Sequence, residues 1–100
     1  MTRPGLRGKL DTGAALMVIL QQVVHDLELT PHRQIWVRAY DGTYSRRLVY
    51  YVGFKIEGHE LWAMRCLAAD RETVLVGRNV LNEFVLTLNG RRLRFDLRLP

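Results

Sequence analysis

The tripeptide Asp11-Thr12-Gly13 is the part of this sequence best suited to chemistry, because it sets an acid between Leu10 and the apolar run 14–20. Burying a carboxylate without a partner costs so much free energy that its presence needs an explanation. Thr12 supplies a short hydroxyl, and Gly13 permits a sharp turn or the close approach of another chain. The tripeptide predicts a loop that presents an acid for catalysis, with an ordinary turn at the end of a strand as the alternative.

Composition places the chain among globular proteins. Its 100 residues fit one domain covering 1–100, and 48% hydrophobic with 25% charged residues is far from the signature of disorder. No apolar run approaches the roughly 20 residues needed to cross a bilayer, and the N-terminus lacks a signal-peptide core. We therefore expect a cytoplasmic protein with no membrane partner. The single cysteine, Cys66, excludes an intrachain disulfide and is expected in the core.

Positive charge raises the question of nucleic-acid binding. The net charge is +5 and the pI is about 10.0, mostly from arginine, a residue suited to phosphate. The basic residues are spread from Arg3 to Arg98 and alternate with apolar ones, so nucleic acid is an unlikely partner. The three histidines have no metal-ligand spacing, so no metal is expected: His25, His32 and His59.

The pattern along the chain predicts a mainly β fold with one or two short helices. A short strand over 6–10 leads into the Asp11 loop, and residues 21–27 form a short amphipathic helix. Residues 34–56 are strand-like around the hairpin signal Asp41-Gly42, and a turn at 57–59 leads to a strand over 61–67. Trp36 and Trp62 lie in these strand-like runs and are expected to be core or interface anchors.

The C-terminal third predicts a buried strand, a helical turn and a hairpin. Residues 73–77 read as the strand and 78–83 as the helical turn. Asn89-Gly90 predicts a tight turn between strands over 84–88 and 91–99. The opposite face of the last strand is expected to face solvent. Strict alternation puts four apolar residues on the other face, namely Leu93, Phe95, Leu97 and Leu99.

The sequence resembles the retropepsin-like aspartic proteases in two segments, 10–14 and 74–81. The hairpin signal between these segments and the segment 86–90 after them add to the resemblance. This single-domain family includes retroviral proteases and bacterial relatives. The resemblance extends from Leu6 to Leu97 and implies a closed or partly open β-barrel. It also implies an aspartic endopeptidase that needs no cofactor.

The resemblance assigns roles to residues of the two segments. Asp11 is implied as the catalytic aspartate, the Thr12 hydroxyl as a link between two active-site loops, and the Gly13 carbonyl as a contact along a bound peptide. Gly77 is implied to allow close packing beneath the Asp11 loop, with Arg78 opening the helix after it. The implied substrate-binding and flap residues are Ala14, Val18, Tyr40, Asp41, Gly42, Thr43, Leu75 and Val76.

The chemistry independently predicts a homodimer. Peptide hydrolysis by carboxylates needs one group to accept a proton from water and another to donate one to the carbonyl, and this chain has one Asp-Thr-Gly. A twofold axis would set Asp11 opposite its symmetry mate, where the two acids share a proton. The shared cleft would accept an extended polypeptide through backbone hydrogen bonds.

The sequence departs from the family pattern in two places. Relatives usually carry a polar residue at the position of Ala15 and often Thr at that of Met17. If that polar residue normally engages the arginine equivalent to Arg78, then Arg78 here must find another partner, such as Asp26, Glu28 or a group across the interface. Ten residues precede Asp11, so we expect that the usual first strand is lacking and that the chain starts short or dimerises weakly.

These departures keep two other functions open. The first is a non-catalytic module of the same fold that binds extended peptides or serves in assembly. The second, less favoured, is a basic β domain that binds nucleic acid with a steep salt dependence.

Overall fold

Most of the chain is β-structure in the computed structural model, which describes residues 5–100. The elements are β1 (Gly8–Leu10), β2 (Met17–Leu20), α1 (Gln21–Asp26), β3 (Arg33–Arg38), β4 (Tyr44–Ile56), β5 (His59–Ala69), β6 (Val74–Val76), α2 (Arg78–Leu81), β7 (Val85–Asn89) and β8 (Arg94–Arg98). The prediction of a mainly β fold with one or two short helices is confirmed.

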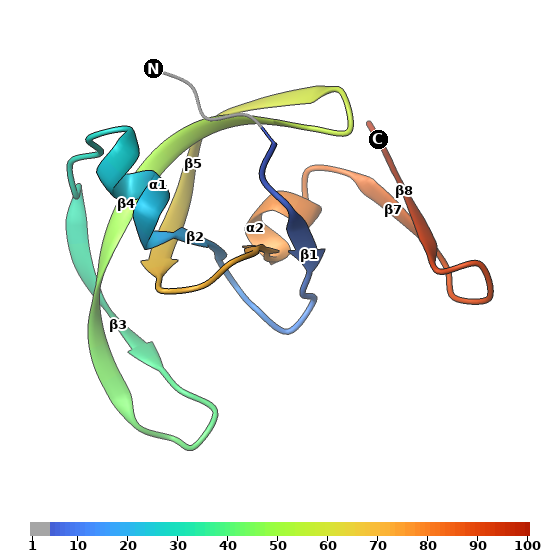
Figure 1. The fold of residues 1–100 in the computed structure, drawn as a ribbon. Coiled ribbons are helices and arrows are strands. Elements are labelled where there is room, and N and C mark those ends of the chain that lie inside the picture. The colour runs from blue at the N-terminus through green and yellow to red at the C-terminus, as the bar shows by residue number, and fades with distance from the viewer. Residues whose placement is uncertain (1–4) are drawn as a thin grey trace.

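Six strands form one sheet in the order β1-β6-β2-β5-β4-β3, and β7 pairs with β8 in a separate hairpin. β1 runs parallel to β6, and β2 lies between β6 and β5. The sheet curves around the core but keeps β1 and β3 at its edges, so it is partly open (Figure 1). This order places the strand that enters the Asp11 loop beside the strand that leads into α2.

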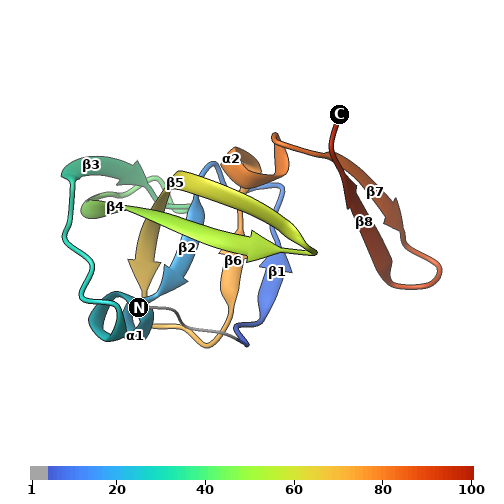
Figure 2. The ribbon, with the colours of Figure 1, turned by 90° about the horizontal axis from the view of Figure 1, so that it is seen from above.

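β4 and β5 form the longest hairpin of the molecule. Their two-residue turn has φ of +46° at Glu57 and +80° at Gly58, as a turn that matches strand twist requires. The hairpin crosses over β2, β6 and β1 (Figure 2). An apolar cleft of about 720 Å³ lies between these layers and is lined by residues that include Met17, Phe54 and Val76.

The buried core joins both helices to the sheet. Val23 and Val24 of α1 are buried, as the helical pattern predicted, and Val80 of α2 is fully buried. Cys66 is also fully buried, which confirms its expected place in the core, and this burial raises the pKa of its thiol to about 12.

The C-terminal hairpin differs from its prediction. Its loop covers 90–93 because Arg92 N donates to Asn89 Oδ1 and Leu93 N donates to Gly90 O, so β8 begins only at Arg94. Leu93 is 91% exposed, and of the four predicted face residues only Leu97 is buried. The hairpin projects from the rest of the protein, which leaves much of that face uncovered (Figures 1 and 2).

Neither tryptophan belongs to the core. Trp36 is 63% and Trp62 is 74% exposed, because both point away from the core-facing side of their strands. The Trp62 indole lies against Gly53, where an added Cβ would come within 2.4 Å of a ring carbon.

Within residues 5–100, neither helix has the length and apolar character to cross a membrane. The expected absence of a strand before Leu6 concerns residues that include 1–4, which lie outside the described part of the chain.

Candidate active site

Asp11 lies in the loop between β1 and β2, with its side chain half-buried. Its Oδ1 accepts a hydrogen bond of 3.0 Å from Gly13 N, and its carbonyl accepts one of 3.2 Å from Ala14 N. Its own N–H donates to Val76 O at 3.0 Å. The carboxylate is therefore held by its local turn, and its backbone is tied to the end of β6.

The start of α2 clamps the rest of the loop. Arg78 N donates to Ala14 O at 2.8 Å, and Asn79 N donates to Ala15 O at 3.1 Å. Gly77 makes this approach possible, because a Cβ there would lie 2.6 Å from the carbonyl carbon and oxygen of Leu16. No ordinary side chain fits that space without moving backbone.

Two side chains of α2 complete the clamp. Arg78 Nη1 donates to the Thr12 carbonyl at 3.0 Å. The guanidinium is thus bonded to the Asp11 loop, not to Asp26 or Glu28 as the sequence suggested. Asn79 Oδ1 accepts from Met17 N at 2.8 Å, and its Nδ2 donates to Arg65 O at 2.8 Å. Asn79 was not among the predicted site residues, although the amide side chain directly after Gly77-Arg78 can both donate and accept hydrogen bonds.

The structure brings most of the predicted site together. Val18 on β2 and Leu75 on β6 are half-buried cross-strand partners beside the loop. Val76 is buried directly beneath it. Asp11 through Ala14, Val18 and 75–78 thus form one continuous group around a single carboxylate.

The four predicted flap residues, Tyr40 to Thr43, form the exposed turn of the β3–β4 hairpin. This turn and the Asp11 loop project from the same side of the molecule, with open space between them in the view of Figure 1. Asp41 Oδ1 accepts from the hydroxyl of Thr43 at 2.7 Å and from its N–H at 3.0 Å. These bonds, led by that of the hydroxyl, lower the pKa of Asp41.

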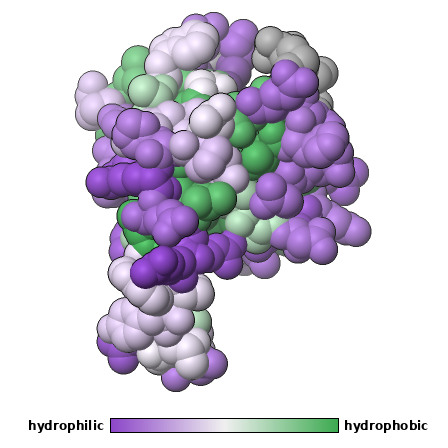
Figure 3. Space-filling view, turned by 90° about the vertical axis from the view of Figure 1, so that its left-hand side faces the viewer, coloured by the Kyte–Doolittle hydropathy of each residue, from purple (hydrophilic) through white to green (hydrophobic). Residues whose placement is uncertain are grey.

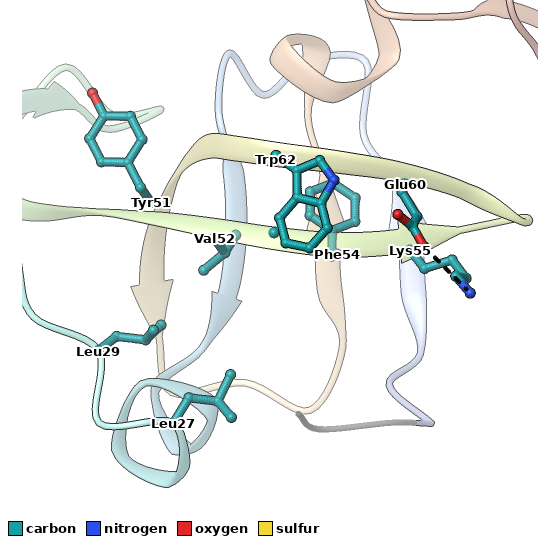
Figure 4. A pocket seen from close by; sticks show the side chains of 9 residues that line it. Leu27, Leu29, Tyr51, Val52, Phe54, Lys55, Glu60 and Trp62 are labelled. Atoms are coloured by element: carbon teal, nitrogen blue, oxygen red, sulfur yellow. Dashed lines mark ion pairs between the residues drawn. The ribbon is translucent and has the colours of Figure 1, made fainter. Parts of the chain in front are cut away.

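Other candidate sites lie elsewhere or are absent. Among residues 5–100, no three His, Cys, Asp or Glu side chains gather to hold a metal ion. A pocket of about 390 Å³ lies beside β4 and is lined by residues that include Leu27, Leu29 and Trp62. Figure 4 shows it with the Lys55–Glu60 ion pair, whose charged atoms are 3.9 Å apart, at one end. It contains none of the predicted site residues.

Solved structures share this fold. The protease-reverse transcriptase of a foamy virus, solved with an RNA/DNA hybrid, matches with a TM-score of 0.65 and 21% identity over 82% of this chain. A retropepsin-like aspartic protease from Rickettsia conorii gives 0.52 and 16% over 80%. The retroviral protease-like domain of Ddi1 from Leishmania major gives 0.56 and 8% over 93%. These matches cover 11%, 64% and 82% of the respective other chains.

Sequence comparison identifies the family. None of the curated protein sequences matches this chain. The family model described as aspartyl protease matches residues 5–83, a span that contains the Asp11 loop, the turn at 40–43 and α2. The chain therefore belongs to the aspartyl protease family and has a retropepsin-like fold.

Proposed function

We propose that two copies of this chain form a homodimeric endopeptidase, in which two Asp11 carboxylates activate water to cleave an extended polypeptide. The observation that carries the proposal is the clamp on the Asp11 loop. Five hydrogen bonds join the backbone of residues 11–17 to residues 76–79. A preorganised loop of this kind holds an acid in position for catalysis.

The reaction requires a pair of acids. One Asp11 carboxylate accepts a proton from water as it attacks the scissile carbonyl, while the protonated acid of the mate donates to the carbonyl oxygen. Two carboxyl groups this close share one proton because their charges repel. Each chain contributes a single clamped Asp11, so half of this machinery comes from the mate.

Three features around Asp11 fit an arrangement with a mate and a peptide bound between the copies. Within residues 5–100 the Thr12 hydroxyl has no hydrogen-bond partner, which leaves it free to bond the same loop of a second copy. The turn at 40–43 projects on the side of Asp11 and would cover a peptide bound between the copies (Figure 1). The half-buried pair Val18 and Leu75 would contact apolar side chains of that peptide.

The β7–β8 hairpin offers a surface for dimerisation. Register places two cross-strand pairs on one of its faces, namely Leu86–Leu97 and Leu88–Phe95. Leu97 is buried against the body, whereas Leu88 is 63% and Phe95 is 42% exposed. Apolar surface that continues from the core onto a projecting hairpin is best covered by another chain, and here the mate is the proposed occupant.

The decisive experiment measures cleavage of an unfolded protein or a peptide library at mildly acidic pH. Asp11→Asn should abolish activity, whereas Asp70→Asn, which removes an exposed acid outside the site, should leave it unchanged. Excess Asp11→Asn chain mixed with wild type should also suppress activity, because mixed dimers carry one acid. Equal rates for wild type and Asp11→Asn would overturn the protease, and peptide binding by both without turnover would establish the non-catalytic module.

A second experiment tests the dimer surface by sedimentation. Leu88→Asp should shift the chain toward monomer and lower activity at low concentration. Thr87→Asp, on the opposite face of the same strand, should leave association unchanged. Identical sedimentation of Leu88→Asp and wild-type dimers would exclude the hairpin as the contact.

A further inference from the structure

The outer side of the β3–β4 hairpin carries an arrangement of side chains that has no role in the reaction proposed for Asp11. Register places Trp36 opposite Arg46 and Arg38 opposite Tyr44. Directly paired residues share a face, as do residues two apart on one strand, so the four side chains alternate aromatic and guanidinium groups in both directions. We call these four residues the outer hairpin face. All four are exposed, while Ile35 and Val37 on the other side of β3 are half-buried.

The outer hairpin face is positively charged and prearranged. The Arg46 guanidinium carbon lies 5.1 Å from the centroid of the Trp36 ring, which holds one cation in place while Trp36 remains 63% exposed. Within residues 5–100, neither Arg38 nor Arg46 forms an ion pair with a carboxylate. Figure 3 looks at this side of the molecule, where the end of the β3–β4 hairpin is the mostly pale segment that projects at the bottom, below strongly hydrophilic groups.

We propose that the outer hairpin face binds single-stranded nucleic acid. Such a strand presents phosphates and flat bases in alternation, and proteins bind it by combining cations for the backbone with aromatic rings for the bases. Side chains two residues apart on a strand are separated by roughly 6.6 Å, so successive groups of the face meet successive groups of an extended strand. An acidic peptide would engage the two guanidinium groups but would leave Trp36 and Tyr44 without a role.

The outer hairpin face shares no residue with the Asp11 loop, although Arg38 and Tyr44 adjoin the turn at 40–43 that is proposed to cover the peptide. Arg38 and Arg46 also lie on a different face from the other two arginines of the hairpin, Arg33 and Arg47. Arg47 points to the opposite side, where its Nη2 donates to Ala68 O at 2.6 Å. A local surface, rather than the net charge of +5, is therefore the proposed binding site.

The test measures fluorescence anisotropy of a labelled oligothymidylate of about 12 nucleotides with the full chain, from about 50 to 200 mM salt. Arg38→Ala/Arg46→Ala should weaken binding at least tenfold, as an order of magnitude, and reduce the slope of log affinity against log salt by about 1.4. Trp36→Ala should weaken binding by about fivefold or more without changing that slope, and Trp36→Phe should restore most of the affinity.

Matched controls distinguish this surface from general charge. Arg91→Ala/Arg92→Ala removes the same charge from the exposed 90–93 turn and should change affinity by no more than about twofold. Asp11→Asn should bind like wild type even though it cannot cleave. An equal loss in the Arg91/Arg92 variant, or the absence of any binding by wild type, would overturn the proposal. Displacement by an oligoglutamate as effective as that by unlabelled oligonucleotide would assign the face to acidic peptides instead.

Discussion

The loop at Asp11 and the turn at Asp41 share a local motif. In each, the aspartate Oδ1 accepts a hydrogen bond of 3.0 Å from the backbone N–H two residues later. The Asp41 turn adds only bonds among its neighbours, such as Ala39 N to Thr43 O at 2.7 Å. The Asp11 loop is instead bonded to residues 76–79, far along the chain. One short motif thus serves a self-sufficient turn and a loop whose shape depends on distant residues.

Among substitutions that distinguish the Asp11 loop from the Asp41 turn, the largest loss of stability is expected at Gly77. Gly77→Ala places a Cβ 2.6 Å from the Leu16 carbonyl group and should lower the free energy of unfolding by about 2 to 3 kcal/mol. Urea denaturation measures the change. Gly90→Ala is the control, because nothing lies within 4 Å of its added Cβ, and it should stay within about 0.5 kcal/mol of wild type. Equal stability of the two variants would mean that the clamp does not constrain the loop.

A smaller effect is expected at Asn79. Asn79→Ala leaves the part-buried Met17 N–H without its acceptor and should cost about 1 to 2 kcal/mol of unfolding free energy. Activity should fall as well, because Met17 continues the Asp11 loop into β2. Asn82→Ala, at an exposed amide just after α2, should change neither quantity. A stable Asn79→Ala variant with full activity would show that this side chain does not position the loop.

A substitution in the turn at 40–43 should change stability and hydrogen exchange only within that turn. Gly42 has φ of +88°, so Gly42→Ala should cost about 1 kcal/mol through backbone strain. Hydrogen exchange should quicken at the Ala39 and Gly42 amides, which donate the bonds within the turn, and stay unchanged at Asp11 and Arg78. Faster exchange at Asp11 as well would show that the two regions are coupled within one chain.

The smallest effect is a pH dependence confined to the Asp41 turn. Bonds from the Thr43 hydroxyl and N–H lower the pKa of Asp41 below its ordinary value of 3.8. The charged carboxylate therefore stabilises the turn above that value, and the contribution is lost as pH falls through the lower folded-state pKa. The Thr43 amide signal in NMR should titrate with a midpoint below 3.8, and Asp41→Asn should remove the titration. A midpoint above 3.8 would contradict the bonding seen here.

The same contrast explains what could be predicted from sequence. Asp41-Gly42 and Glu57-Gly58 are turns with local signals, and both were predicted correctly. The Asn89-Gly90 signal was misleading, because side-chain and backbone bonds among residues 89–93 favoured a longer loop. Asn79 was missed since its partners, Met17 N and Arg65 O, become neighbours only through strand pairing. The exposure of Trp36 was also hidden, because composition alone does not tell which side of a strand faces water.

The parallel pairing of β1 with β6 also sets the order of events during synthesis. Asp11 is synthesised 65 residues before the start of the segment that shapes its loop, residues 76–79. Domains generally fold as units, so a nascent chain that has not yet reached residues 76–79 carries the acid in an unformed loop. A nascent chain that ends before residues 76–79 therefore lacks the clamped aspartate, and any activity that depends on this clamp can begin only after that segment has been made.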